Sequence, residues 1–305
     1  MAVWLGLVLS LPVAGGQAGQ PSGLEQSAGL PPAVAEVIRN FGGRLAFAAE
    51  HLGSGRSLRY RAEELVQTAS VIKLPIMVEV FFQAQEGRLD LRRRLRYEES
   101  NRVPGAGILQ DLTPGLELPL IDAVTLMIVL SDNTATNMVI DQVGIQAVNQ
   151  RMQQLGLTRT RLNKKVYLPA DETVPPESAR FGLGVTTADD MLELLRRLYR
   201  RQLVDAEASA TMLAILEKQR DQEQIPRLLT GPEWEGVKVA HKTGALDQVR
   251  NDVGLVSTPR GDFALSLFAW ESPDRRWTVD NQASVTLARL ARALLDHLAG
   301  EQAEP

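Results

Sequence analysis

The sequence SVIKLPIMVEVFF, residues 70–82, organises the rest of the chain. Its apolar run predicts a buried helix, and Pro75 favours a place near the helix start because proline has no N–H to donate. Ser70 is then expected at the helix N-terminus, with Lys73 one turn later on the same face. A partly desolvated lysine with a lowered pKa can take the proton of a serine hydroxyl. The two residues are therefore a candidate nucleophile and base.

This pattern is weak evidence by itself. At average residue usage, S-x-x-K occurs about once by chance in a chain of this size. A helix-start serine followed by a solvated lysine would explain the pattern equally well. The positive end of the helix dipole would favour negative charge developing beside Ser70, but only a second motif can decide between the two interpretations.

The composition is that of a globular protein and excludes several kinds of site. The 305 residues are 44% hydrophobic and 23% charged, which suits one large domain or two small ones. A net charge of -4 without a long basic run argues against nucleic acid as a partner. The chain has no cysteine, and its three histidines, His51, His241 and His297, are far apart. We therefore expect no disulfide, no bound metal and no cofactor.

The N-terminal residues resemble an export signal. Residues 2–14 are uncharged and mostly apolar, and the small residues Gly15, Gly16 and Ala18 follow. This pattern predicts a signal peptide over residues 1–22, cleaved after Ala18, although the usual positive start is missing. The alternative is a buried N-terminal helix. The run is too short to span a membrane, so we expect no membrane association beyond the signal peptide.

The chain ends favour strands and the middle favours helices. Strands are expected at residues 44–50, 57–60, 237–243, 252–257 and 263–270. Helices are expected at residues 31–41, 70–87, 121–130, 134–143, 146–154, 187–200, 206–218 and 280–298, with a long ordered loop over residues 164–184. The economical architecture is α+β: an antiparallel sheet built from both chain ends with helices packed on it, and an inserted all-helical domain.

This architecture also predicts the domain boundaries. Residues 23–68 and 221–300 would form the α/β sandwich domain, residues 69–220 the all-helical domain, and residues 301–305 a short tail.

Two further triplets support a chemical role for the first motif. Ser131-Asp132-Asn133 follows a predicted helix, and Lys242-Thr243-Gly244 lies on a predicted strand that ends in a turn. Each triplet is rarer by chance than S-x-x-K. With these motifs the chain resembles class A β-lactamases and penicillin-binding proteins. The resemblance covers roughly residues 25–300 and includes RVPGAGIL, residues 102–109, and LMIVLSDNTATNMVI, residues 126–140.

The resemblance implies a role for each matching residue, and each can be stated physically. Ser70 would attack the carbonyl, Lys73 would accept or relay its proton, and Ser131 would pass a proton to the leaving nitrogen. By analogy, the backbone N–H groups of Ser70 and Ala245 would form the oxyanion hole. The substrate would be bound by Asn133, through its side-chain amide, and by Lys242, Thr243, Gly244 and Arg250, at the end that carries the carboxylate.

The chain departs from the family where the deacylating glutamate is expected. Residues 161–170 read RLNKKVYLPA, with Val166 in place of the glutamate and Ala170 in place of an asparagine. Valine cannot take a proton from water. The candidate substitutes are Asp171, Glu172 and Glu177 further along the loop, which solvated loop charges would explain equally well.

The main expectation is a periplasmic or secreted, monomeric serine hydrolase that opens β-lactams through an acyl-enzyme, with deacylation as the slow step. A penicillin-binding protein-like DD-peptidase or esterase, acting on a peptidoglycan-like substrate with the same machinery, is the alternative. A non-enzymatic β-lactam-binding module is the third.

Overall fold

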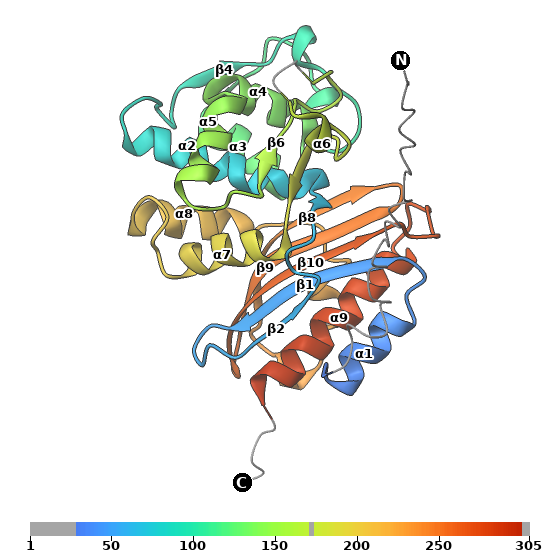
Figure 1. Cartoon of the computed structure of the whole chain (residues 1–305). Helices are drawn as coiled ribbons and strands as arrows, with labels where there is room; N and C mark the ends of the chain where they lie inside the picture. The colour runs from blue at the N-terminus through green and yellow to red at the C-terminus, as the bar shows by residue number, and fades with distance from the viewer. Residues whose placement is uncertain (1–28, 171–173, 301–305) are drawn as a thin grey trace, which may run out of the picture.

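The fold is built on an antiparallel sheet that joins both ends of the chain. The computed structural model describes residues 29–170 and 174–300. Within them, one sheet has the strand order β2-β1-β10-β9-β8 (Figure 1), with β1 Arg44–His51, β2 Ser57–Tyr60, β8 Lys238–Leu246, β9 Val249–Thr258 and β10 Gly261–Trp270. Strand β1 pairs with β10, from Arg44 opposite Trp270 to His51 opposite Phe263. The predicted α+β class is confirmed.

Two helices cover one face of this sheet. They are α1, Pro32–Arg39, and α9, Gln282–Ala299, at opposite ends of the chain (Figure 1). Their apolar sides bury Val34 and Leu290 in one cluster with Phe47 and Leu265 from the strands. The alternation of strand side chains places these residues on the face away from the remaining helices.

The other face carries the helical part of the chain. Its helices are α2 Lys73–Gln85, α3 Leu120–Val129, α4 Asn133–Val143, α5 Ile145–Gln154, α7 Ala188–Tyr199 and α8 Ala206–Leu216. Helix α7 packs against β1, β9 and β10. One hydrophobic cluster therefore runs from Met77 on α2 to Val253 and Phe268 on the sheet. The predicted separation into two domains at residues 69 and 220 stays a prediction.

Short elements connect these layers, and the sequence patterns do not predict them. One small sheet has the strand order β3-β7-β6, with β3 Val66–Gln67, β7 Gly184–Thr186 and β6 Arg161–Leu162. A second pairs β4 Arg94–Arg96 with β5 Glu117–Pro119. Helix α6 spans Pro176–Ala179, and the 3-10 turns are η1 Ala69–Ile72, η2 Glu99–Asn101, η3 Leu109–Asp111, η4 Ile225–Leu228 and η5 Pro232–Trp234. Strands of two or three residues are too short to show a period-two pattern, which is why periodicity does not reveal them.

Ser70 does not begin the α-helix as expected. It lies in η1, and the α-helix starts three residues later at Lys73. Ala69 has a φ of +44°, in the left-handed region that non-glycine residues seldom adopt, so the chain turns sharply just before Ser70.

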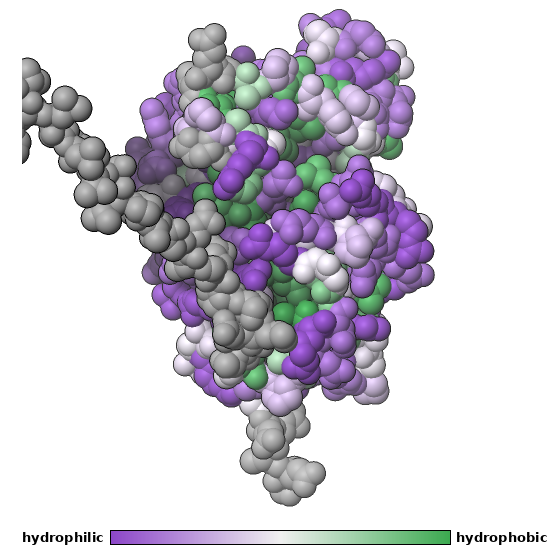
Figure 2. All heavy atoms as spheres, turned by 45° about the vertical axis from the view of Figure 1, so that its right-hand side comes forward, coloured by the Kyte–Doolittle hydropathy of each residue, from purple (hydrophilic) through white to green (hydrophobic). Residues whose placement is uncertain are grey.

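The surface is mostly polar. Figure 2 shows hydrophilic residues over the projecting parts of one face, with hydrophobic residues gathered in the hollows between them. Among the described residues, no helix combines the length and apolar character needed to cross a membrane. The predicted signal peptide and the 301–305 tail lie outside the described residues.

Candidate active site

Ser70 lies in η1, which packs against β8 and β9 of the sheet. A methyl group built on Gly244 of β8 would lie 2.6 Å from Thr68 O and 3.0 Å from Ser70 N. Only glycine therefore allows the strand this close to the serine backbone. From β9, Asn251 Nδ2 donates hydrogen bonds to Gln67 O at 2.8 Å and to Thr68 O at 3.1 Å. Ser70 Oγ itself has no hydrogen-bond partner among the described residues.

Ser131 joins the two buried lysines of the site. Its Oγ lies 3.1 Å from Lys73 Nζ and 3.1 Å from Lys242 Nζ. Lys73 also donates to Ser131 O at 2.7 Å and to Asn133 Oδ1 at 2.9 Å, and Lys242 donates to Thr243 O at 2.7 Å. The structure thus brings together residues from all three motifs, from α2, from the α3–α4 connection and from β8.

Burial lowers the pKa values of these two lysines. Both side chains are fully buried. Burial lowers the pKa of Lys73 well below its ordinary value, the charge of Lys242 lowers it further, and Asp132 opposes the shift. Burial lowers the pKa of Lys242 to about 8, with Asp221 and Asp252 opposing. Lys73 is thereby suited to be a neutral base and Lys242 a cation near neutral pH.

Lys73 Nζ contacts three oxygens, Ser131 O, Ser131 Oγ and Asn133 Oδ1, and these contacts fit both of its protonation states. A neutral amine has two N–H groups and one lone pair, whereas an ammonium has three N–H groups. The carbonyl oxygens of Ser131 and Asn133 can only accept, so they use both N–H groups. In the ammonium form the third N–H donates to Ser131 Oγ, and in the neutral form the lone pair is left free to accept a proton. Ser131 Oγ thus lies within hydrogen-bond distance of both lysines, and a proton can pass between Lys73 and Ser131.

Asp132 has a structural role at the site, because its carboxylate binds backbone N–H groups of α4 and of a neighbouring loop. Its carboxylate caps α4 by accepting from Ala135 N at 2.8 Å. Its second oxygen accepts from Ile108 N at 2.7 Å and Leu109 N at 2.8 Å. A methyl group on Gly107 would lie 2.3 Å from this carboxylate, so the loop over residues 103–109 closes on it only because Gly107 has no side chain.

Two residues at the site have left-handed backbone conformations: the residue before the candidate nucleophile, and the candidate proton carrier itself. Ala69 precedes Ser70 with a φ of +44°, and Ser131 has a φ of +53°. Such conformations cost on the order of 1–3 kcal/mol each and persist only where the surroundings hold them, most often at active sites. Asp132 and the lysine contacts hold Ser131 in this conformation.

Ala245 and Arg250 face each other across the β8–β9 hairpin. The Arg250 guanidinium donates to the backbone oxygens of Leu246, Val249 and Arg276 and lies 4.6 Å from the centre of the Trp277 ring. These bonds use three of its five N–H groups, so two have no acceptor among the described residues. Arg250 is only 4% exposed, and it supports the turn next to Ala245.

The loop after Asn163 places an apolar residue where the resemblance to class A β-lactamases leads us to expect a glutamate. Val166 is 8% exposed, and Asn137 on α4 holds both its N–H, at 2.8 Å, and its carbonyl, at 3.0 Å. Asp171 and Glu172 lie outside the described residues. Glu177 belongs to α6, but its side chain is outside the described part of the chain. No side chain described between residues 164 and 183 is a carboxylate.

The sequence did not predict the buried pair of His241 on β8 and Asp252 on β9. His241 Nδ1 lies 2.9 Å from Asp252 Oδ1, and both side chains are fully buried. Asp252 also accepts from Ile225 N at 3.0 Å. Through Asp252, His241 on β8 is therefore linked to Ile225 of η4. An acidic residue directly before the apolar run 253–256 of a central strand is the signal that could have indicated Asp252 as a buried partner.

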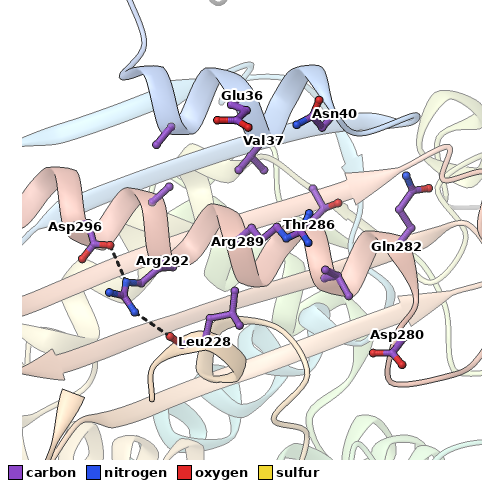
Figure 3. A pocket seen from close by; sticks show the side chains of 13 residues that line it. Glu36, Val37, Asn40, Leu228, Asp280, Gln282, Thr286, Arg289, Arg292 and Asp296 are labelled. Atoms are coloured by element: carbon purple, nitrogen blue, oxygen red, sulfur yellow. Dashed lines mark hydrogen bonds and ion pairs between the residues drawn. The ribbon is translucent and has the colours of Figure 1, made fainter. Parts of the chain in front are cut away.

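A separate pocket lies on the far face of the sheet. It has a volume of about 650 Å³ and lies between α1 and α9 (Figure 3). Arg292 crosses it, bonded to Asp296 and to Leu228 O. None of the three motifs contributes to its lining, so it is distinct from the Ser70 site.

The fold and the site together define an active-site serine hydrolase: a serine just before a helix start, with two buried lysines meeting on a second serine. Comparison with known proteins narrows this class. A model of the Beta-lactamase enzyme family matches residues 30–298. The chain therefore belongs to this family and is a class A β-lactamase-like serine hydrolase.

Individual relatives agree with this assignment. A β-lactamase of Rhodobacter capsulatus is 24% identical, over 87% of this chain and 88% of its own. The crystal structure of a β-lactamase from Sphaerobacter thermophilus is 31% identical with a TM-score of 0.77, covering 93% of this chain and 98% of that one. A structure of a PBP-A point mutant, described as an acyl-enzyme complex with penicillin G, is 26% identical with a TM-score of 0.72, covering 86% and 94%.

Proposed function

We propose that this protein is an exported hydrolase that opens β-lactam rings through an acyl-enzyme at Ser70. The hydrogen-bonded chain from Lys242 through Ser131 to Lys73 carries the proposal. Ser70 Oγ attacks the lactam carbonyl, and its proton passes to neutral Lys73. When the C–N bond breaks, the ring nitrogen takes the Ser131 proton, which the Lys73 ammonium replaces. Lys73 therefore ends the acylation step in its starting state.

The backbone and the second lysine would orient the substrate. The N–H groups of Ser70 and Ala245 stabilise the oxyanion, because Gly244 brings β8 against the Ser70 backbone. Lys242 and the Thr243 hydroxyl bind the substrate carboxylate, with Arg250 adding its two remaining N–H groups. Asn133 presents its amide to the substrate side chain.

Deacylation would be the slow half of the reaction. General-base help contributes about 10²–10⁴-fold to a step, and Val166 cannot supply it to the hydrolytic water. Asp171, Glu172 and Glu177 remain the candidates for that base. With the acylating residues in place and the base missing from its usual position, the acyl-enzyme should accumulate.

The same observation favours a second candidate function. A DD-peptidase or esterase would use the acylation machinery on a peptidoglycan-like or ester substrate and would hold penicillins as long-lived adducts. A module that is acylated and never released, acting only as a β-lactam binder, is the extreme of this behaviour.

Rapid-quench kinetics with a chromogenic cephalosporin would test the proposal. We expect a burst close to one product per enzyme, followed by slow turnover, and one covalent adduct by intact-protein mass spectrometry. Ser70→Ala should abolish both, whereas Ser54→Ala, in the β1–β2 turn, should change neither. Alanine variants of Asp171, Glu172 and Glu177 would identify any base that supports the slow phase.

Three outcomes would contradict parts of this proposal. An adduct that survives Ser70→Ala would exclude Ser70 as the nucleophile. Fast steady turnover with no accumulated adduct would contradict slow deacylation. A burst without any turnover, together with hydrolysis of a D-alanyl peptide or an ester, would favour the second candidate.

A further inference from the structure

Tyr167 is exposed and yet firmly placed. Tyr167 is 63% exposed, although the residue before it is held by the two Asn137 hydrogen bonds. Lys165, two residues before Tyr167, forms an ion pair with Asp141 on α4. Tyr167 has a φ of +59°, a conformation that a bulky residue keeps only when its surroundings impose it. The loop therefore fixes the backbone at Tyr167 and presents its ring at the surface.

The ring of Tyr167 borders the same space as the amide of Asn133. A methyl group built on Gly105 would lie 3.0 Å from Tyr167 Oη, 3.4 Å from its Cε2 and 2.8 Å from Asn133 Nδ2. Asn133 Nδ2 is held by Pro104 O at 3.0 Å, and its Oδ1 accepts from Lys73. Gly105, with a φ of +95°, leaves room for the phenol beside the catalytic centre.

We propose that Tyr167 is a specificity-determining residue that selects acyl donors with an aromatic or large apolar side chain. Its ring forms one wall of the region where Asn133 receives the substrate side chain, so the inference rests on the proposed function. An exposed aromatic face next to an amide suits a ligand that combines an amide with an aryl group, because the amide pairs with Asn133 and the aryl group packs on the ring.

Two penicillins separate this role from general catalysis. Benzylpenicillin and 6-aminopenicillanic acid share the lactam ring and carboxylate, but only the first has an aryl acyl side chain. For Tyr167→Ala we expect the second-order rate constant of acylation to fall about five- to tenfold with benzylpenicillin, the value of one aromatic contact. With 6-aminopenicillanic acid we expect less than about a twofold change, because this substrate has no aryl group to lose.

Three matched variants distinguish loss of the aromatic ring from damage to the folded loop. Tyr167→Phe should retain the preference because the ring remains. Tyr167→Asn should lose it while suiting the left-handed backbone, since asparagine tolerates positive φ. Leu168→Ala truncates the neighbouring residue, which is 42% exposed, and should leave both rates unchanged.

Equal losses with both penicillins, or no loss with either, would overturn the specificity role while leaving the Ser70 acyl-enzyme in place. Loss of the preference in Tyr167→Phe would also overturn it, because the ring would not be the selecting group. If neither penicillin forms an adduct with the unmodified protein, the proposed function itself fails and the inference falls with it.

Discussion

Lys73 and Lys242 have the same side chain and different tasks. Both are fully buried and both contact Ser131 Oγ at 3.1 Å. Lys242 opposes protonation of Lys73, whereas the carboxylates of Asp221 and Asp252 support protonation of Lys242. Burial lowers both pKa values, and the different charges around the two lysines then separate a base from a cation within one hydrogen-bonded chain.

The pH profile of acylation should reflect this separation. Lys73 is active when neutral, so the rate should rise as pH increases through its lowered pKa. Lys242 binds a carboxylate when protonated, so the rate should fall as pH rises through its pKa of about 8. We expect a bell-shaped profile for a carboxylate-bearing β-lactam, measured by stopped-flow acylation on both sides of that pKa.

An ester of the same β-lactam is the control, because it has no carboxylate for Lys242 to hold. Its profile should keep the acidic limb and lose most of the fall above a pH of about 8. Lys242→Met should remove the same alkaline limb and lower acylation of the acid about 10- to 100-fold. Identical alkaline limbs for acid and ester would contradict the assignment of Lys242.

Arg250 is expected to assist Lys242 at the carboxylate. Arg250→Ala removes a charge-assisted hydrogen bond worth about 1.5–3 kcal/mol, so acylation by the acid should fall roughly 10- to 100-fold. The fall with the ester should be smaller. Equal falls would instead indicate that the guanidinium only supports the turn through Leu246 O, Val249 O and Arg276 O.

At the scale of elements, Asp132 joins α4 to the loop over residues 103–109. Three backbone N–H groups depend on its buried carboxylate. Asp132→Ala leaves them without acceptors, and we expect the free energy of unfolding to fall by about 3–5 kcal/mol. Urea unfolding followed by circular dichroism would measure the change.

Asp122, an exposed carboxylate in the first turn of α3, provides the matched control. Asp122→Ala should change the unfolding free energy by less than about 0.5 kcal/mol. A similar small effect for Asp132→Ala would show that the loop does not depend on this clamp.

At the scale of the whole molecule, one hydrophobic cluster contains residues of both the helices and the sheet. It therefore fixes the position of the helical part of the Ser70 site relative to β8. Because the motifs come from η1 and α2, from the start of α4 with the two residues before it, and from β8, the site exists only when these parts are packed together. Acylation should therefore be lost at the same denaturant concentration at which the sheet unfolds.

Export is a prediction about the whole chain. N-terminal sequencing of protein recovered from the producing cells should find a start near residue 19, and Val8→Arg should block processing because a charge interrupts the apolar segment. Soluble cytoplasmic protein that retains Met1 would contradict export.

The three motifs, the α+β class and most element positions could be predicted from the sequence. Residue types at close spacing report local chemistry, as with Ser70 and Lys73, and hydrophobic periodicity reports helices and strands of ordinary length. The resemblance carried by Ser131-Asp132-Asn133 and Lys242-Thr243-Gly244 also indicated the family and the departure at Val166.

Only the tertiary structure placed Asp132 on two loop N–H groups, His241 on Asp252, Asn137 on Val166 and Tyr167 beside Gly105. These pairs are separated by 11 to 62 positions in the sequence, as 241 to 252 and 105 to 167 show, so no local periodicity links them. The pKa values of the buried lysines likewise depend on burial and on charges from other elements. Such properties arise from packing, which brings distant parts of the chain into contact and removes them from water.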